Sequence, residues 1–445
     1  MMKKIFITIL SVIAFGACDV LDTEPQTSLD GNTVLVDAAS AEGILLGAYS
    51  TMQSDVYYGT EYVLNIDLIA DNSVFEGFYD SQMEIDQKAV PFTNLWVTDI
   101  WVSIYRVINM ANLLIDDVDG IDDPALDRDR VFGEAHAVRA LAYFDLLRVY
   151  GEHFDTQSNY GIPLLISSIP DSDFNQIPDL PRATVAETYA QILSDLNTAI
   201  ELTEGSSDTG TMNYWAALSL RARVNLYKKD YQAAWDDANE VITNGPFFLE
   251  SNLDNLYFTT EASSESIFEV EFNDQDQSAF NTYTIRRNEY NVDISLLESF
   301  EEGDARANYF TVAQGRDKTN KYSDNTNSNN TKVIRLAELY LIRSEAATMN
   351  SNDPNTGLDD LNTIRNRAGL GSITSIATLE DYKDIILAER RAELNFEGHR
   401  FFDLVRLDKI GEVLDMEDFR KVFPIPRTEL QVSPALVQNP GYESN

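Results

Sequence analysis

The sequence predicts a mainly α-helical fold, in which helical hairpins of the tetratricopeptide type form a scaffold beside an irregular, loop-rich half with a few short strands. Two observations carry this prediction. Apolar residues recur at helical spacing over many segments, and two of these segments, Tyr214–Tyr227 and Tyr231–Ile242, are joined by a very short turn. By contrast, residues 55–90 and much of 250–331 show no sustained period.

Apolar spacing and capping signals place the helices. Thr184, with Glu187 three residues later, predicts a capping box at the start of one helix, and Asp230 is expected to cap another. In chain order, helices are expected at Ala38–Met52, from Trp96 to Ile115, and at Val131–Tyr150, Val185–Leu202, Tyr214–Tyr227, Tyr231–Ile242, Lys332–Asn350, Pro354–Ala368 and Leu379–Phe396.

Small residues mark the best helical hairpin. Ala217 and Ala222 on its first helix, with Ala234 and Ala238 on its second, allow the two helices to pack closely. A similar pair recurs in 332–368. Because the repeats are not consecutive, we do not expect a regular solenoid.

The segments between the helices lack the helical spacing of apolar residues. Ser266–Phe272 alternates as a strand does, and Tyr283–Tyr290 is expected to be a second strand. The segment 308–331 is long, polar and rich in Asn and Ser. A structureless segment of that length is usually functional or mobile.

The first residues predict an exported, lipid-anchored protein. Lys3 and Lys4 precede an apolar run, Ile5–Phe15, that is shorter than the roughly 20 residues needed to span a bilayer but suits a signal peptide. The run ends at Gly16-Ala17-Cys18, which resembles a bacterial lipoprotein signal. We expect a signal peptide over 1–17, lipid attachment at Cys18 and a polar tether over 18–32. The alternative is an ordinary signal peptide with a spare thiol.

Composition excludes several classes of protein. The formal net charge is −40, from 73 acidic and 33 basic residues, so nucleic acid is an improbable partner. Aromatic residues make up 11% of the chain, which argues against disorder. Cys18 is the only cysteine, so stability must come from a packed core rather than from disulfides.

Several motifs together resemble the SusD/RagB family of outer-membrane nutrient-binding lipoproteins. They follow one another in the family's order over nearly the whole mature chain. The most specific are Glu389-Arg390-Arg391-Ala392-Glu393-Leu394, Glu397-Gly398-His399-Arg400 and Phe402-Asp403-Leu404-Val405-Arg406. The tail Phe423-Pro424-Ile425-Pro426 completes the set.

The resemblance implies a SusD-like fold over 33–445, with the helical scaffold mainly in 95–245 and 332–406 and the ligand site in 55–90 and 250–331. It also implies a cell-surface protein that captures oligo- or polysaccharides for a SusC-like TonB-dependent outer-membrane transporter. Peptide capture, as in RagB-like members, is an alternative. A surface glycoside hydrolase and a structural adhesin are further ones.

The charged motif near residue 390 has two interpretations. Glu389, Glu393 and Glu397 lie on one helical stripe, where like charges repel unless basic groups compensate them. We expect a buried structural ion-pair network, because arginine binds carboxylates bidentately. A carboxylate pair for glycoside hydrolysis is the alternative. The expected basic partners are Arg390, Arg391, Arg400 and Arg406, and Asp403 is expected to belong to the same network.

No catalytic or cofactor motif is found. His136, His153 and His399 have no metal-ligand spacing, so packing or hydrogen bonding is their expected role. A glycine-rich phosphate loop and a Gly-x-Ser-x-Gly motif are both absent. We expect a non-catalytic binding protein without a metal or another cofactor.

Carbohydrate binding needs aromatic rings for the apolar faces of sugars and polar groups for their hydroxyls. Trp96, Trp101, Trp215 and Trp235 lie at helical spacing and are expected to be core residues. A neutral glycan is preferred, because the acidic chain repels polyanions. The candidate ligand residues lie in the irregular segments: Tyr57, Tyr58, Asp71, Asn72, Phe75, Phe78, Tyr79, Tyr283, Arg286, Tyr290, Tyr309 and Tyr322, with Arg287 beside them.

Overall fold

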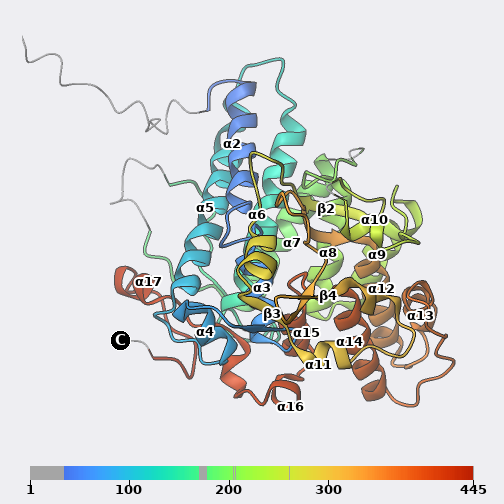
Figure 1. The fold of residues 1–445 in the computed structure, drawn as a ribbon. Helices are drawn as coiled ribbons and strands as arrows, with labels where there is room; N and C mark the ends of the chain where they lie inside the picture. Colours follow the sequence, from blue (N-terminus) through green and yellow to red (C-terminus); the bar gives the residue numbers. More distant parts are fainter. Residues whose placement is uncertain (1–34, 170–177, 204, 206, 260, 444–445) are drawn as a thin grey trace, which may run out of the picture.

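The computed structural model describes residues 35–443, apart from 170–177, 204, 206 and 260 (Figure 1). The expected signal peptide (1–17), Cys18 and the tether (18–32) lie outside the described residues. Within them, no helix is both long and apolar enough to cross a membrane.

The fold is mainly α-helical, as predicted. All the expected helices are present, most of them within a few residues of their predicted bounds. The α-helices are α2 (Ala38–Met52), α3 (Glu61–Ile69), α4 (Asp80–Asp86), α5 (Leu95–Asp117), α6 (Arg128–Tyr150), α7 (Val185–Leu202), α8 (Tyr214–Lys228), α9 (Tyr231–Asn244), α10 (Asp254–Tyr257), α11 (Ile294–Glu298), α12 (Leu336–Ser351), α13 (Leu358–Arg367), α14 (Leu379–Leu394), α15 (Arg400–Arg406), α16 (Ile410–Leu414) and α17 (Arg427–Val432).

The long helices form one continuous series in space. Each packs against the next, in the order α2, α5, α6, α7, α8, α9, α12 and α13, and the series crosses Figure 1 from the blue helix α2 to α13 at the right. The repeats are separated in sequence, as predicted. The chain leaves the series after α9, builds the irregular half and returns at α12.

Small residues and buried faces hold the series together. Ala217, Ala222, Ala234 and Ala238 are all fully buried between α8, α9 and their neighbours. Helix α6 is buried over nearly its whole length and runs through the main core. The tryptophans also belong to this core, as expected: Trp96 and Trp101 are buried, and Trp215 and Trp235 pack against it.

The capping expectations were right for one helix and wrong for the other. Thr184 and Glu187 form the expected capping box at α7. Asp230 occupies the N-cap position of α9, but its side chain makes no capping hydrogen bond. Its carboxylate lies 3.3 Å from Lys228 Nζ instead, so this ion pair replaces the cap.

The strands form three two-stranded antiparallel sheets. β1 (Ser73–Phe75) pairs with β3 (Tyr290–Val292), β2 (Ser266–Val270) with β6 (Thr331–Arg335), and β4 (Phe310–Ala313) with β5 (Arg316–Thr319). The expected strand at Ser266–Phe272 is therefore confirmed as β2. β6 precedes α12, so the helix expected from Lys332 begins at Leu336 instead.

The prediction of a strand at Tyr283–Tyr290 was wrong. Thr282–Arg286 is a turn of π-helix, and only Tyr290 belongs to a strand. Local bonds satisfy this backbone: Tyr283 N donates to Ala279 O at 3.0 Å, and Arg287 N donates to Thr282 O at 2.9 Å. The segment therefore needs no strand partner.

Two segments expected to be irregular contain regular structure. Within 308–331, β4 and β5 form a hairpin whose turn has Gln314 and Gly315 at φ 53° and 79°, the conformation that suits a tight hairpin. Within 55–90, α3 and α4 are helical. Helix α3 is buried on nearly all sides, so its sequence lacks the one-sided apolar pattern of a surface helix.

Candidate functional site

Tyr57 and Tyr58, two of the candidate ligand residues, lie inside the core. Both hydroxyls donate to Asp145 Oδ2, that of Tyr58 at 2.8 Å. Tyr62 OH donates to the other oxygen of the same carboxylate at 3.0 Å. Tyr57 and Tyr58 are at most 4% exposed, so they are corrected to structural residues that a ligand does not reach in this structure.

Five further candidates are also buried and engaged. Asn72 Oδ1 accepts from Arg391 Nε at 2.9 Å, Phe75 packs edge-on against Tyr290, and Tyr322 stacks on Phe280 with ring centroids 4.0 Å apart. Tyr290 OH donates to Asn65 and Tyr309 OH to Asp254. Phe75, Tyr290 and Tyr322 belong to the main core and Tyr309 to a small separate one, so these side chains do not form a ligand surface.

Asp71 also belongs to the scaffold. Arg400 holds it in a bidentate pair, with Nε and Nη2 at 2.7 and 2.9 Å from its oxygens. Burial would raise the pKa of the Asp71 carboxyl, but the bonds and charge of Arg400, with Arg391, lower it below its usual value. The Asp71 carboxylate is therefore already paired with arginine in this structure and is not free to bind a ligand.

The remaining candidates meet on the surface. Phe78 and Tyr79 are 94% and 49% exposed. The Arg287 guanidinium lies over the Tyr283 ring, 5.2 Å from its centroid, and its Nη1 donates to Tyr79 OH at 3.4 Å. We call this surface, formed by Phe78, Tyr79, Tyr283, Arg286 and Arg287, the aromatic patch.

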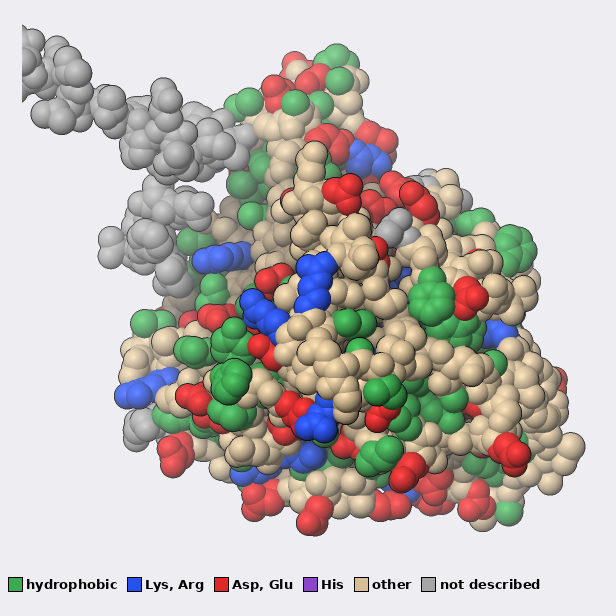
Figure 2. Space-filling model, in the orientation of Figure 1, with side chains coloured by type: hydrophobic (Ala, Val, Ile, Leu, Met, Phe, Trp, Pro, Cys, Tyr) green, Lys and Arg blue, Asp and Glu red, His purple; other side chains and the backbone are tan. Residues whose placement is uncertain are grey.

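Two elements from distant parts of the sequence position the aromatic patch. Tyr79 is the N-cap residue of α4, and Tyr283 belongs to the π-helical turn. The β4–β5 hairpin fixes that turn, because Gln314 Nε2 donates to Ile285 O at 2.8 Å. Figure 2 shows hydrophobic side chains over the α4 region, with basic side chains nearby towards the centre of this face.

Polar groups that the sequence did not reveal border the aromatic patch. Gln82 Nε2 donates to Glu61 Oε1 at 3.3 Å. Burial raises the pKa of Glu61 to about 7, and the nearby carboxylates of Asp55 and Asp99 contribute. Burial also raises the pKa of the Tyr283 phenol, as does the charge of Glu61. The aromatic rings and the guanidinium of the patch thus lie near carboxyl groups and an amide. Proteins use this combination of side chains to bind sugars.

The charged motif forms a buried ion-pair network. Arg335 contacts both Glu393 and Glu397, and Arg306 contacts both Glu389 and Glu393. These side chains are at most 4% exposed. Burial alone would raise the pKa of Glu393, but three arginines lower it well below its usual value. The network also includes Lys321 with Glu397, Arg365 with Glu389, and Arg367 with Glu265 and Glu393.

All eight residues of the expected network form ion pairs, but the three glutamates pair with other basic residues than the arginines of the motif. Arg390 bonds Asp403, Arg406 bonds Asp403 and Glu345, and Arg391 and Arg400 bond Asp71. The reason is helical geometry, because residues one or two positions after a glutamate project from other faces of the helix. The glutamates are paired instead with basic residues brought in by the irregular half and by α13.

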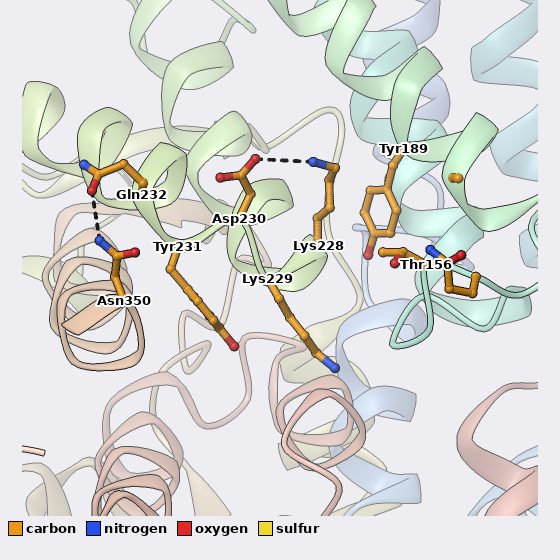
Figure 3. Close-up of a pocket in the computed structure, with 10 residues that line it drawn as sticks. Thr156, Tyr189, Lys228, Lys229, Asp230, Tyr231, Gln232 and Asn350 are labelled. Carbon is orange, nitrogen blue, oxygen red and sulfur yellow. Dashed lines mark hydrogen bonds and ion pairs between the residues drawn. The ribbon is translucent and has the colours of Figure 1, made fainter. Parts of the chain in front are cut away.

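Two cavities, but no metal-binding cluster, lie among the described residues. In the described part of the chain, no group of three or more His, Cys, Asp or Glu side chains is arranged to hold a metal ion. A cavity of about 540 Å³ lies beside the turn between α8 and α9 (Figure 3), and one of about 320 Å³ lies between α2 and α6. Neither of these two cavities is lined by a residue of the aromatic patch.

Comparison with known proteins gives consistent matches. The family model described as "SusD family" matches residues 298–418, and the one described as "Starch-binding associating with outer membrane" matches residues 19–226. A SusD-like protein of Formosa agariphila is 27% identical over 99% of each chain.

Solved structures share the fold. A SusD superfamily protein from Bacteroides vulgatus has a TM-score of 0.80 and 27% identity, and the match covers 92% of this chain and 100% of that one. A laminarin-binding SusD-like protein has a TM-score of 0.78 and 24% identity, with the same coverage.

Proposed function

This chain belongs to the SusD family, and on that premise we propose that it captures glycans at the cell surface through the aromatic patch. The observation that carries the proposal is the Tyr79–Arg287–Tyr283 arrangement. Sugar rings stack their apolar faces on such aromatic side chains, while guanidinium, amide and carboxyl groups bond their hydroxyls. Glu61, whose charge acts on Tyr283, and Gln82, which donates to Glu61, supply further polar groups near the rings.

The preferred ligand is a neutral glycan. Asp55 lies beside Arg287 and offsets its charge, and the whole chain carries −40. A polyanion such as alginate is therefore repelled over most of the surface. A neutral β-glucan oligosaccharide is the first ligand to test, and a laminarin-binding protein of the same fold supports that choice.

The proposal includes an anchor and a partner. We infer that lipid on Cys18 tethers the protein to the outer membrane. In support, the description of one matching family model names association with the outer membrane. A SusC-like TonB-dependent transporter is the proposed acceptor of the glycan. The role is capture and delivery rather than hydrolysis.

A ligand panel tests the proposal. Calorimetry with a neutral β-glucan oligosaccharide and an unrelated peptide should give heat of binding for the neutral glycan alone. Binding of the peptide alone would replace the glycan function with peptide capture. New reducing ends in the glycan sample would instead show hydrolysis.

A further inference from the structure

A second feature with ligand-binding chemistry lies in the helical scaffold, at the turn between α8 and α9. The cavity of about 540 Å³ is within the range of roughly 300–1,000 Å³ typical of small-molecule sites. Its walls come from separate elements: the α8–α9 turn, the loop after α6, the start of α7 and the end of α12. None of its lining residues belongs to the aromatic patch.

Lys229 gives the cavity its charge. It lies at the C-cap of α8 with φ 65° and ψ 25°, a left-handed conformation that usually belongs to glycine. Its Nζ donates to Phe154 O at 3.2 Å, and no carboxylate pairs with it among the described residues. In a chain with 73 acidic and 33 basic residues, such a cation is available to an anionic ligand.

Lys228 can add a second positive charge. It pairs with Asp230 at 3.3 Å, with side chains 33% and 46% exposed. Ion pairs at this exposure are weak and exchange readily with other partners. Because salt limits the range of surface charges to about 8 Å at physiological ionic strength, these lysines, rather than the total charge of the chain, govern attraction at the cavity.

The other walls supply groups for hydroxyls and for a ring. Asn350 Nδ2 donates to Gln232 Oε1 at 2.9 Å, which joins α12 to α9 and presents two amides at one wall. Thr156 and Gln157 lie on the opposite loop. The Tyr231 side chain extends in the same direction as that of Lys229 (Figure 3) and is half-buried, so its ring is held in place.

We propose that this cavity binds a short carboxylated saccharide, with Lys229 bonding the carboxylate. The amides and the threonine would bond its hydroxyls, and the Tyr231 ring would contact its apolar face. A neutral saccharide lacks the group that Lys229 recognises. The cavity therefore differs in ligand class from the aromatic patch.

The test uses a disaccharide that ends in glucuronate and the corresponding neutral disaccharide, each titrated into the full soluble chain. Lys229→Gly removes the ammonium and suits the left-handed backbone, so the variant should fold. Loss of one charge-assisted hydrogen bond should weaken glucuronate binding about tenfold or more. Thermal unfolding confirms the fold of each variant.

Lys88→Gly is the matched control. Lys88 also has a left-handed backbone, at φ 57°, and lies outside the cavity, so the same substitution removes the same charge elsewhere. The control and Tyr283→Ala should both leave glucuronate affinity unchanged. The proposal fails if wild-type protein binds no glucuronate at millimolar concentrations, if the neutral disaccharide binds equally well, or if the two lysine variants behave alike.

Discussion

Arg335 and Glu397 join the two halves of the molecule: Arg335 Nε donates to Glu397 Oε2 at 2.7 Å, and each side chain is 2% exposed. Arg335 ends strand β6 of the irregular half, and Glu397 follows helix α14 of the scaffold. The same guanidinium also bonds Glu265 and Glu393. One buried cation thus bonds three carboxylates, whose charge it compensates together with Arg306, Lys321 and Arg367.

Arg335→Met should destabilise the protein strongly. The substitution leaves three buried carboxylates with fewer partners, and breaking such a network by removing one member costs about 3–5 kcal/mol. Denaturant unfolding should show this loss. As control, Lys383→Met breaks the exposed pair with Glu380 and should change the free energy of unfolding by less than about 1 kcal/mol. Equal effects of the two substitutions would contradict a structural role for the network.

Tyr58→Phe tests whether Tyr58 contributes to stability rather than to glycan binding. The phenylalanine keeps the packed ring but removes the hydrogen bond to Asp145, which should cost about 1–3 kcal/mol because a buried carboxylate loses a donor. Glycan affinity at a temperature where the variant is folded should equal that of the wild type. A selective loss of affinity would restore Tyr58 to the ligand site.

Glu61→Gln should change the pH dependence of stability. The usual pKa of 4.5 applies in the unfolded chain, and burial raises it to about 7 in the folded protein. The stabilising contribution of the protonated Glu61 is therefore complete below pH 4.5 and is lost as the pH rises through 7. The glutamine variant has no such proton to lose.

Its stability relative to the wild type should thus increase between pH 4.5 and 7, by about 2–3 kcal/mol. Denaturant unfolding across this range measures the difference. Glu201→Gln, an exposed change on α7, controls for removal of one negative charge. Parallel curves for wild type and Glu61→Gln would show that Glu61 is not buried in this way.

Cys18→Ser tests the proposed anchor. The variant should fold and bind glycan like the wild type, because Cys18 precedes the described fold, but it should leave the outer-membrane fraction. The measurement is fractionation of cells from which the transporter has been deleted. Retention of the variant in the membrane would mean that lipid on Cys18 is not the tether.

The sequence predicted helices such as α5, α7 and α9 well, because each buries one face and carries a periodic signal. It failed at two short elements that carry no such signal. Helix α3 is buried on nearly all sides, and the turn at Thr282–Arg286 contains strand-forming residues that bond locally as a π-helix. Neither element has a periodic pattern of apolar residues by which the sequence would identify it.

Long-range contacts explain what the sequence could not predict about the site. Tyr57 and Tyr58 resemble surface aromatics in the sequence, and only the approach of Asp145 on α6 makes them core residues. In the same way, Tyr79 and Tyr283 meet through Arg287 although they lie in distant segments. Glu61 and Gln82 carried no motif, since their role depends on the same folding.

The central claim is that the aromatic patch binds a neutral glycan. Its most direct test is calorimetric titration of a neutral β-glucan oligosaccharide into the wild type, Tyr283→Ala and the double variant Tyr79→Ala/Tyr283→Ala. Phe248→Ala, which removes another exposed ring (69% exposed) outside the patch, is the control. The account predicts that each tyrosine variant binds at least about tenfold more weakly, or about 1.4 kcal/mol, while Phe248→Ala binds like the wild type. Unchanged affinity in the folded double variant would contradict it.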